Sequence, residues 1–309
     1  MLLEKENLVL VNSFYSNSHL LSGLIEFLED YFTVHFIDLP GFIGHVPPLE
    51  TISLETFRAY VRERIEDLDL PRYILGGISF GFLVVSGLPV DPRCLGITAI
   101  VPFTHRDALN LGARKMTAYS FVTKTVSALN LGSWAWSSPC VRRFARWYSI
   151  YPPERVDAIF DQMDGRTFFE TGKLIMETRD LGPFQDLRTV LIISERDTTL
   201  NNGPITDIFR RRVDELKIVT TSIEHYPNNL DKDYFRENFR EENVREIIRF
   251  FNGRPATLRV SPDPSSFLPS RRVPETRTPP RTGPGPGGRG LPPGRSPNRP
   301  RTGRRPPGR

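Results

Sequence analysis

The sequence is poor in cysteine and contains no long apolar segment. Its two cysteines, Cys94 and Cys140, stand among apolar and aromatic residues, so we expect buried, reduced thiols rather than a disulfide. No run approaches the ~18 apolar residues that a membrane-spanning helix needs. The N-terminal apolar stretch is short and follows Glu4, Lys5 and Glu6, which is not the pattern of a signal peptide. We therefore expect a cytoplasmic protein without a membrane partner.

Lysine is absent and large apolar residues are scarce after residue 252. Residues 253–309 hold thirteen arginines and only Asp263 and Glu275, a net charge of +11, which leaves −6 for residues 1–252 of the chain's +5. A Pro/Gly/Arg segment of this kind cannot bury enough apolar surface to order itself, so we predict a disordered tail over 253–309. Three interpretations of the tail stay open: a solvated extension without a role, weak polyanion binding through arginine, or a wrongly assigned gene end. The acidic body gives no reason to expect nucleic-acid binding.

Residues 1–252 alternate apolar runs of strand length with segments of helical periodicity. The expected strands cover 8–14, 33–41, 73–79, 95–103, 189–195 and 216–222. The expected helices cover 18–30, 56–68, 80–88 and 233–251. Strands and helices that alternate in this way form right-handed crossovers. The sequence therefore predicts an α/β fold with a mostly parallel central sheet and helices on both faces.

The stretch between the fourth and fifth expected strands has no strand signal and is rich in aromatic residues. It is too long for a connecting loop, so we predict a helical insertion over 104–186. The insertion would divide an α/β core into a first part, 1–103, and a second part, 187–252. The disordered tail at 253–309 would complete the chain.

The third expected strand runs into Gly77-Ile78-Ser79-Phe80-Gly81, and an apolar helix is expected to follow. A serine between two glycines at a strand-to-helix turn is typical of a nucleophile elbow. The turn is so tight that side chains at the flanking positions would clash, and glycine removes them. Such a turn lifts the serine hydroxyl to the carboxyl edge of the sheet. The alternative is a plain strand–helix turn without chemistry.

A nucleophilic serine needs a base, and the base needs a carboxylate that orients it. Asp197 follows the fifth expected strand, and His225 follows the sixth, so both fall at the carboxyl edge of the sheet, where parallel-sheet active sites are built. Their order after Ser79 is that of a Ser-acid-His triad on this type of sheet. The other histidines fit less well: His19 and His45 lie in early loops, His35 lies within a strand, and His105 opens the insertion.

With these residues in view, 8–251 resemble the α/β-hydrolase family, in the capped branch that holds small esterases, epoxide hydrolases and related acyl hydrolases. Besides the serine motif, the resemblance is carried by DLPGFIGH (38–45), by SERDTTL (194–200) and by EHYPNNL (224–230). These segments resemble the loop after the family's second conserved strand, its acid loop and its histidine loop.

The family usually has His-Gly after its first central strand, and the next residue donates a backbone N–H to an oxyanion. Here Asn12-Ser13 stand in those places, followed by Phe14. By position, the resemblance implies that the N–H groups of Phe14 and Phe80 form the oxyanion hole, because backbone donors depend little on the side chain. The Ser13 hydroxyl would be an additional donor.

The resemblance implies acyl transfer to Ser79, followed by hydrolysis by a water that His225 activates. The substrate would be an ester or thioester of a small, largely apolar molecule, and no metal or cofactor is implied. The insertion would cap the site, with its aromatic residues lining an apolar pocket or forming the cap's own core. Arg142, Arg143 and Arg146 would form a solvated helix face or a clamp for a substrate carboxylate.

Two other functional classes remain open at this stage. A lyase of the same fold would use the same residues on a different bond. A non-catalytic member would use the pocket for binding, which the replacement of His-Gly by Asn12-Ser13 makes more plausible.

Overall fold

The protein is described by a computed structural model that covers residues 5–148, 153–182, 187–227 and 230–253. The tail predicted at 253–309 lies outside the described residues, except for Gly253. Within the described part, no helix is both long enough and apolar enough to cross a membrane.

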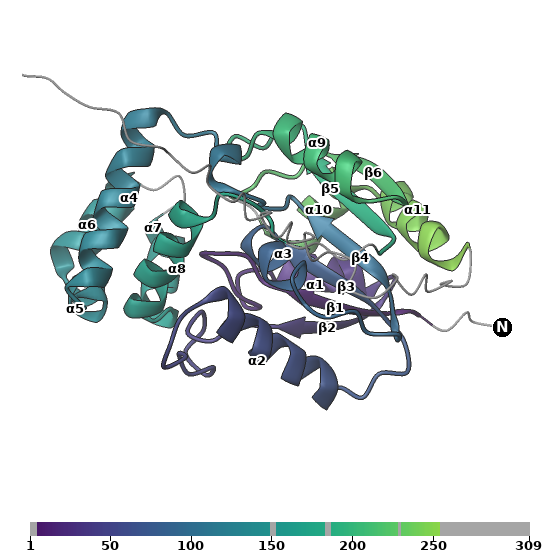
Figure 1. The fold of residues 1–309 in the computed structure, drawn as a ribbon, viewed down its shortest axis with the longest axis horizontal. Helices are drawn as coiled ribbons and strands as arrows, with labels where there is room; N and C mark the ends of the chain where they lie inside the picture. The colour runs from purple at the N-terminus through teal and green to yellow at the C-terminus, as the bar shows by residue number, and fades with distance from the viewer. Residues whose placement is uncertain (1–4, 149–152, 183–186, 228–229, 254–309) are drawn as a thin grey trace, which may run out of the picture. The chain divides into compact units, whose positions relative to one another are not determined.

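A parallel sheet forms the centre of the described body (Figure 1). Its strands lie in the order β2-β1-β3-β4-β5-β6, and all neighbours pair in parallel. The bounds are β1 Asn7–Val11, β2 Thr33–Ile37, β3 Tyr73–Ile78, β4 Cys94–Ile100, β5 Thr189–Ser194 and β6 Leu216–Thr221. Because all strands are parallel, the carboxyl ends of β1, β3, β5 and β6 lie at one edge of the sheet, and the order of the strands reverses between β1 and β3.

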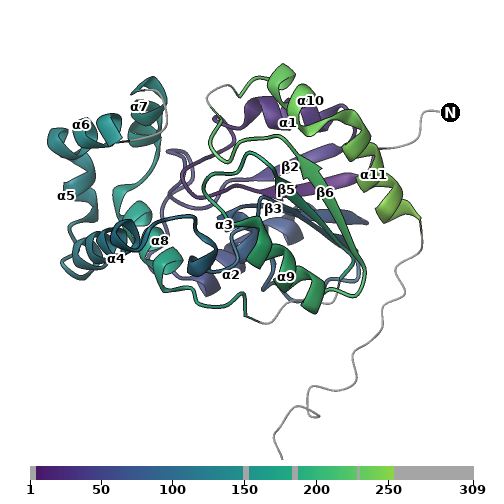
Figure 2. The same cartoon turned by 90° about the horizontal axis from the view of Figure 1, so that it is seen from above.

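Helices cover both faces of the sheet, because alternate strand residues are buried on opposite sides. On one face, Val9 and Val11 belong to a buried cluster with residues of α2 (Leu54–Asp67), α3 (Phe80–Val85) and α9 (Asn202–Arg212). On the other face, Leu8 and Leu10 belong to a cluster with residues of α1 (Ser22–Glu29), α10 (Lys232–Phe239) and α11 (Glu241–Asn252). Figure 2 shows the two helical layers on either side of the strands. The prediction of an α/β fold with helices on both faces is confirmed.

The segment between β4 and β5 is helical where the structure describes it. It comprises a short 3₁₀ helix η1 (Arg106–Ala108), then α4 (Ala113–Ala128), α5 (Gly132–Ser137), α6 (Pro139–Tyr148), α7 (Pro153–Gln162) and α8 (Gly165–Glu177). Helices α4 to α8 form a group beside the sheet rather than over either of its faces (Figures 1 and 2).

Three local predictions were wrong or incomplete. The expected helix 233–251 is two helices, because the chain turns at Arg240, whose φ is +67°. Helix α9 was not predicted, although Asn201 caps it and Pro204 lies in its first turn. Cys94 is buried as expected, but Cys140 is exposed near the start of α6.

Candidate active site

Ser79 lies at the turn between β3 and α3 in a backbone conformation that few residues other than glycine adopt. Its φ is +48° and its ψ is −113°. Three backbone hydrogen bonds hold it there: its N–H donates to the Ile100 carbonyl at 2.9 Å, and its own carbonyl accepts from Phe82 and Phe103, each at 3.1 Å. A strained residue that its surroundings fix so firmly is a frequent feature of functional sites.

The two glycines of the turn are required by close backbone contacts. A Cβ on Gly77 would lie 2.5 Å from the Phe82 nitrogen, and a Cβ on Gly81 would lie 2.3 Å from the Asn12 carbonyl oxygen. Real Cβ atoms do not approach backbone atoms this closely. Glycine therefore allows α3 to turn back against β3 and lets the end of β1 lie beside the turn.

Gly81→Ala should destabilise the fold by about 3 kcal/mol, because neither the end of β1 nor α3 can move away from the new methyl group without disturbing the sheet. Gly112→Ala is the matched control, since a Cβ there meets no atom within 4 Å and the glycine has an ordinary φ of −60°. Urea unfolding of both variants measures the difference. Equal stability of the two variants would show that the close packing at Gly81 is not real.

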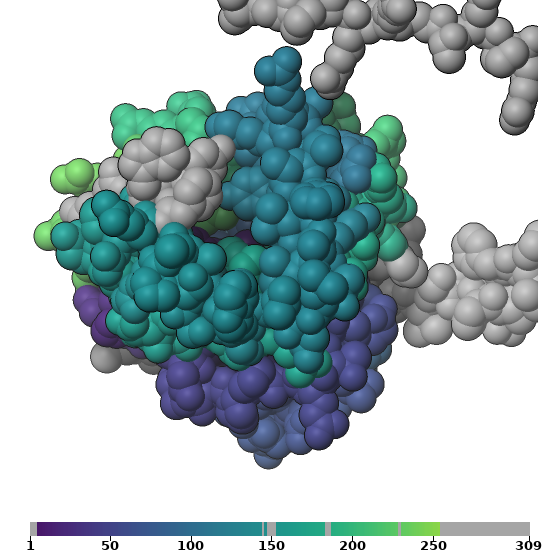
Figure 3. Space-filling model, turned by 90° about the vertical axis from the view of Figure 1, so that its left-hand side faces the viewer, coloured from purple at the N-terminus to yellow at the C-terminus, as the bar shows by residue number. Residues whose placement is uncertain are grey.

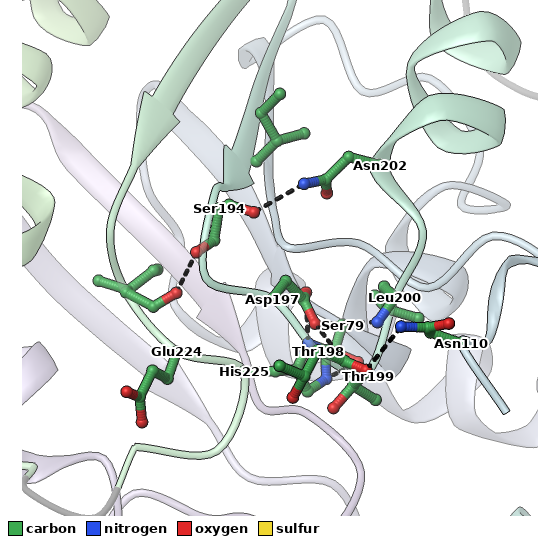
Figure 4. A network of polar contacts seen from close by, with 12 residues as sticks. Ser79, Asn110, Ser194, Asp197, Thr198, Thr199, Leu200, Asn202, Glu224 and His225 are labelled. Carbon is green, nitrogen blue, oxygen red and sulfur yellow. Dashed lines mark hydrogen bonds and ion pairs between the residues drawn. The ribbon is translucent and has the colours of Figure 1, made fainter.

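The structure brings Ser79, His225 and Asp197 together at the carboxyl edge of the sheet (Figure 4). Ser79 Oγ lies 3.1 Å from His225 Nε2, and His225 Nδ1 lies 2.9 Å from Asp197 Oδ2. The His225 side chain is 4% exposed and the Asp197 side chain is fully buried, while Ser79 is 7% exposed. The three groups thus form one hydrogen-bonded chain that is almost withdrawn from water.

Asp197 is held as a carboxylate. Burial by itself raises the pKa of this group, but hydrogen bonds from His225 and from the backbone N–H groups of Leu200 and Thr199 outweigh burial and lower it. The two backbone groups donate to Asp197 Oδ1 at 2.9 and 2.8 Å, so Oδ2 is left to face the imidazole. Its lowered pKa keeps Asp197 ionised at neutral pH.

This lowered pKa predicts how stability depends on pH. Because the pKa of Asp197 is lower in the folded protein than in the unfolded chain, its stabilising contribution is present above the unfolded value and is lost as the pH falls through the folded value. The difference in unfolding free energy between the wild type and Asp197→Asn should therefore narrow as the pH falls into the acidic range. Denaturant titrations at several pH values measure this difference, and a difference independent of pH would contradict the prediction.

The loop that carries Asp197 is held by the segment that leads into α4. Asn110 accounts for two hydrogen bonds: its N–H donates to the Thr199 carbonyl at 2.7 Å and its side chain donates to the Thr198 carbonyl at 3.2 Å (Figure 4). Leu109 and Leu200 also form an antiparallel bridge. The start of the helical segment is therefore anchored directly on the acid loop.

The loop that carries His225 is held from the other side. Ser194 Oγ donates to the Ile223 carbonyl, and Asn202 donates to the Ser194 carbonyl at 2.6 Å. Beyond His225, the Tyr226 ring meets the imidazole edge-on, with 4.7 Å between the ring centroids. The guanidinium of Arg155, on α7, donates to the Pro227 carbonyl. These supporting residues were not predicted, because no sequence motif relates a base loop to residues so distant in the chain.

Asn12 organises the loop after β1, where the family usually has histidine. It is fully buried; its Oδ1 accepts from the Leu39 N–H at 2.9 Å, and its Nδ2 donates to the Ser16 carbonyl at 2.7 Å. The Ser13 hydroxyl is 2.7 Å from the Ser16 hydroxyl. Asn12 and Ser13 therefore stabilise a tight turn after β1, in which the Ser13 hydroxyl is hydrogen-bonded to the Ser16 hydroxyl.

The proposed oxyanion donors come from two elements that meet at the turn. Phe80 is the first residue of α3, so its N–H belongs to the helix terminus next to Ser79. Phe14 lies in the loop that Asn12 organises, and its ring stacks on Phe168 of α8 at 5.2 Å. The close approach of the Asn12 carbonyl to Gly81 brings the end of β1 beside the turn that holds Phe80.

The aromatic residues of the helical segment have two different environments. Trp136 and Phe160 are buried and stacked at 3.9 Å, so they form part of the segment's own core. Phe168 joins this core to the loop after β1 through Phe14 and Tyr15. Four of these rings, Trp136, Phe160, Phe168 and Phe169, thus form the segment's own core, as one of the two interpretations expected. Tyr119, Phe121 and Trp134 are exposed instead, and an apolar pocket lined by the segment stays a prediction.

The arginines of α6 do not present a vacant clamp. Arg142 and Arg146 both bind Asp157 of α7, at 2.8 and 2.7 Å, and Arg142 also binds Asp161 at 2.8 Å. Asp157 and Asp161 therefore bind the guanidinium groups that the clamp interpretation assigned to a substrate carboxylate. Within the described residues, no group of three histidine, cysteine or acidic side chains is arranged to hold a metal ion.

Comparisons with known proteins bear on the family and the fold of the chain. Residues 8–229 match the alpha/beta hydrolase family, and no curated protein matches the sequence. Among solved structures, a thermophilic esterase from Thermogutta terrifontis is 16% identical, with a TM-score of 0.54 over 80% of this chain and 91% of its own. An epoxide hydrolase from Bacillus megaterium is 12% identical, with a TM-score of 0.54 over 81% and 94%. The bottromycin epimerase BotH is 19% identical, with a TM-score of 0.52 over 75% and 86%.

At these identities the structural likeness shows a shared fold and nothing finer. The family match is of a different kind, because it spans most of the chain and includes β1, the serine turn and the loops that hold Asp197 and His225. The chain therefore belongs to the alpha/beta hydrolase family.

Proposed function

We propose that this protein is a serine hydrolase that cleaves an ester or thioester of a small, largely apolar substrate through Ser79, His225 and Asp197. One observation carries the proposal. The hydroxyl of a serine held at positive φ is hydrogen-bonded to an imidazole, which is in turn hydrogen-bonded to a buried carboxylate. This is the geometry that nucleophile activation requires.

In the first half-reaction, Ser79 Oγ attacks the carbonyl carbon of the substrate and His225 Nε2 takes the hydroxyl proton. The N–H groups of Phe14 and Phe80 stabilise the negative oxygen of the tetrahedral intermediate. When the intermediate collapses, the bond to the alcohol or thiol breaks, and that group leaves with the proton from His225. The acyl group remains on Ser79 as an ester.

In the second half-reaction, a water gives its proton to His225 and attacks the acyl carbon. Collapse releases the carboxylic acid and returns the proton to Ser79 Oγ. Asp197 keeps the Nδ1 hydrogen in place and stabilises the imidazolium that forms in each half-reaction. Its two backbone donors hold the carboxylate in the orientation that this task needs.

We further propose that residues 104–186 act as a cap over this site. Three contacts support this proposal: Asn110 binds the acid loop, Arg155 on α7 donates to the Pro227 carbonyl, and Phe168 on α8 stacks on Phe14. Apolar rings at such a position exclude water and accept an acyl or alcohol chain.

A series of p-nitrophenyl esters of graded acyl length tests the proposed reaction, with the corresponding thioesters run in parallel. We expect turnover that depends on acyl length and reaches a maximum at one chain length, since the cap limits the space. Absence of turnover with every ester and thioester would reject a hydrolase of this substrate class. A lyase or a binding protein on the same fold would then be favoured.

A further inference from the structure

Six large apolar side chains are exposed on α4, on α5 and in the turn between these helices. Among the described residues, only Val90 is a comparably exposed large apolar residue elsewhere. The set, hereafter the α4–α5 face, is Tyr119, Phe121, Val122, Leu129, Leu131 and Trp134, which are 37–68% exposed. An exposed apolar group of this size usually marks an interaction surface.

Helix α4 directs its apolar residues outward together with two cations. At about 100° per residue, Phe121 and Val122 lie on the same side of the helix as Arg114 and Lys115, and opposite the buried Thr123. Figure 3 looks onto the side of the molecule that the inserted helices form, with α4 in blue-teal. The outward side of α4 therefore combines large apolar groups with positive charge.

The sequence around this face carries charge of one sign only. Between Asp107 and Glu154 it contains no acidic residue, and its cations are Arg114, Lys115, Lys124, Arg142, Arg143 and Arg146. Three of these cations are paired within the protein, Lys124 with Glu177 and both Arg142 and Arg146 with Asp157. The positive charge that concerns the outward side of α4 is therefore that of Arg114 and Lys115, and an apolar, negatively charged partner would complement it.

We propose that the α4–α5 face docks on the surface of an anionic lipid bilayer. Phe121 and Trp134 would enter the boundary between headgroups and acyl chains, where aromatic side chains are favoured. Arg114 and Lys115 would lie among the anionic headgroups, each contributing to attraction that falls with salt. Such a contact needs no membrane-spanning segment, so it is compatible with the finding that no helix of the described residues could cross a membrane.

Two other occupants fit the face less well. A second copy bound face to face would bring the same cations of both copies together, since a two-fold contact pairs a surface with itself. A soluble polyanion would satisfy Arg114 and Lys115, but it would leave Phe121 in water. Of these three occupants, an anionic lipid surface is the one that meets both properties.

Fluorescence quenching tests the depth of the contact in the full-length chain. Vesicles of phosphatidylcholine with phosphatidylglycerol would carry bromine atoms on the lipid acyl chains, which quench tryptophan at short range. We expect the wild type to be quenched more strongly than Trp134→Phe, because Trp134 is 68% exposed and the other two tryptophans, Trp136 and Trp147, are common to both proteins. Ser79→Ala should be quenched like the wild type, so this result is independent of the proposed reaction.

Vesicle flotation of matched variants tests the apolar contact and the electrostatic attraction separately. The melting temperature of each variant shows whether it is folded. Phe121→Ser and Arg114→Glu/Lys115→Glu should each weaken binding by about tenfold or more. The controls are Val90→Ser and Arg210→Glu/Arg211→Glu, which make the same kinds of substitution at exposed residues outside the α4–α5 face. Both controls should bind vesicles like the wild type.

Equal loss in the matched controls, or binding without quenching of Trp134, would overturn the proposal. The second outcome would assign the vesicle contact to another part of the chain. A concentration-dependent dimer that Phe121→Ser abolishes, without vesicle binding by the wild type, would instead identify a second copy as the occupant.

Discussion

Replacement of Ser79 by alanine should lower ester hydrolysis by about 10⁴- to 10⁶-fold, the loss expected when a triad nucleophile is removed. The change deletes only the hydroxyl that lies 3.1 Å from His225 Nε2. It leaves intact the three backbone hydrogen bonds that hold the residue at the turn. Steady-state rates with the best p-nitrophenyl ester of the series measure the effect, and the melting temperature should stay close to that of the wild type.

Ser86→Ala is the matched control for this substitution. Ser86 follows α3, is fully buried and donates its hydroxyl to the Leu83 carbonyl, so it tests the loss of a buried serine hydroxyl without touching the site. Its activity should equal that of the wild type. Turnover by Ser79→Ala within about tenfold of the wild type would reject the serine mechanism.

Asp197→Asn should lower the rate by about 10⁴-fold while the fold is kept. The asparagine can still accept from Thr199 and Leu200 through its amide oxygen. Its amide nitrogen then faces His225 and favours the wrong imidazole tautomer, which leaves Nε2 protonated and unable to accept from Ser79. The rate constant with a single ester at saturating concentration measures the loss.

Asp38→Asn provides the comparison for this second substitution. Asp38 is another largely buried acid, whose pKa burial raises and whose Oδ1 accepts from the Ser18 N–H at 2.7 Å. It follows β2, away from the acid loop, and its replacement should leave the rate almost unchanged. A similar loss in both variants would mean that Asp197 acts only through general stability.

The sequence predicted best those elements whose hydrophobic pattern matches their burial in the fold. The six apolar runs became strands within a few residues of the expected bounds. The inner strands are apolar because both of their faces are buried, whereas the edge strands β2 and β6 are only partly buried. The break at Arg240 could not be foreseen: 232–252 has a continuous helical pattern, and a non-glycine residue at positive φ is selected only by tertiary packing. Helix α9 was foreseeable from Asn201 and Pro204.

Some residues of the candidate site could be predicted from the sequence, and others could not. Ser79, Asp197 and His225 could be named in advance because each follows a strand, and parallel strands bring their carboxyl ends to one edge. Asn110 and Asn202 could not, since a hydrogen bond to a backbone carbonyl leaves no pattern in the donor's sequence neighbourhood. Cys140 was expected to be buried from its apolar neighbours, but helical geometry places it on the outer side of α6.

The most direct test of the central claim is to locate the residue that a fluorophosphonate modifies. Such a reagent forms a phosphonyl ester with a serine only where an adjacent base activates the hydroxyl. Intact-mass spectrometry of the full-length protein should show one adduct, and peptide mapping should place it on Ser79, with no adduct in Ser79→Ala. An unmodified wild type, or an adduct on any other residue, would contradict the account.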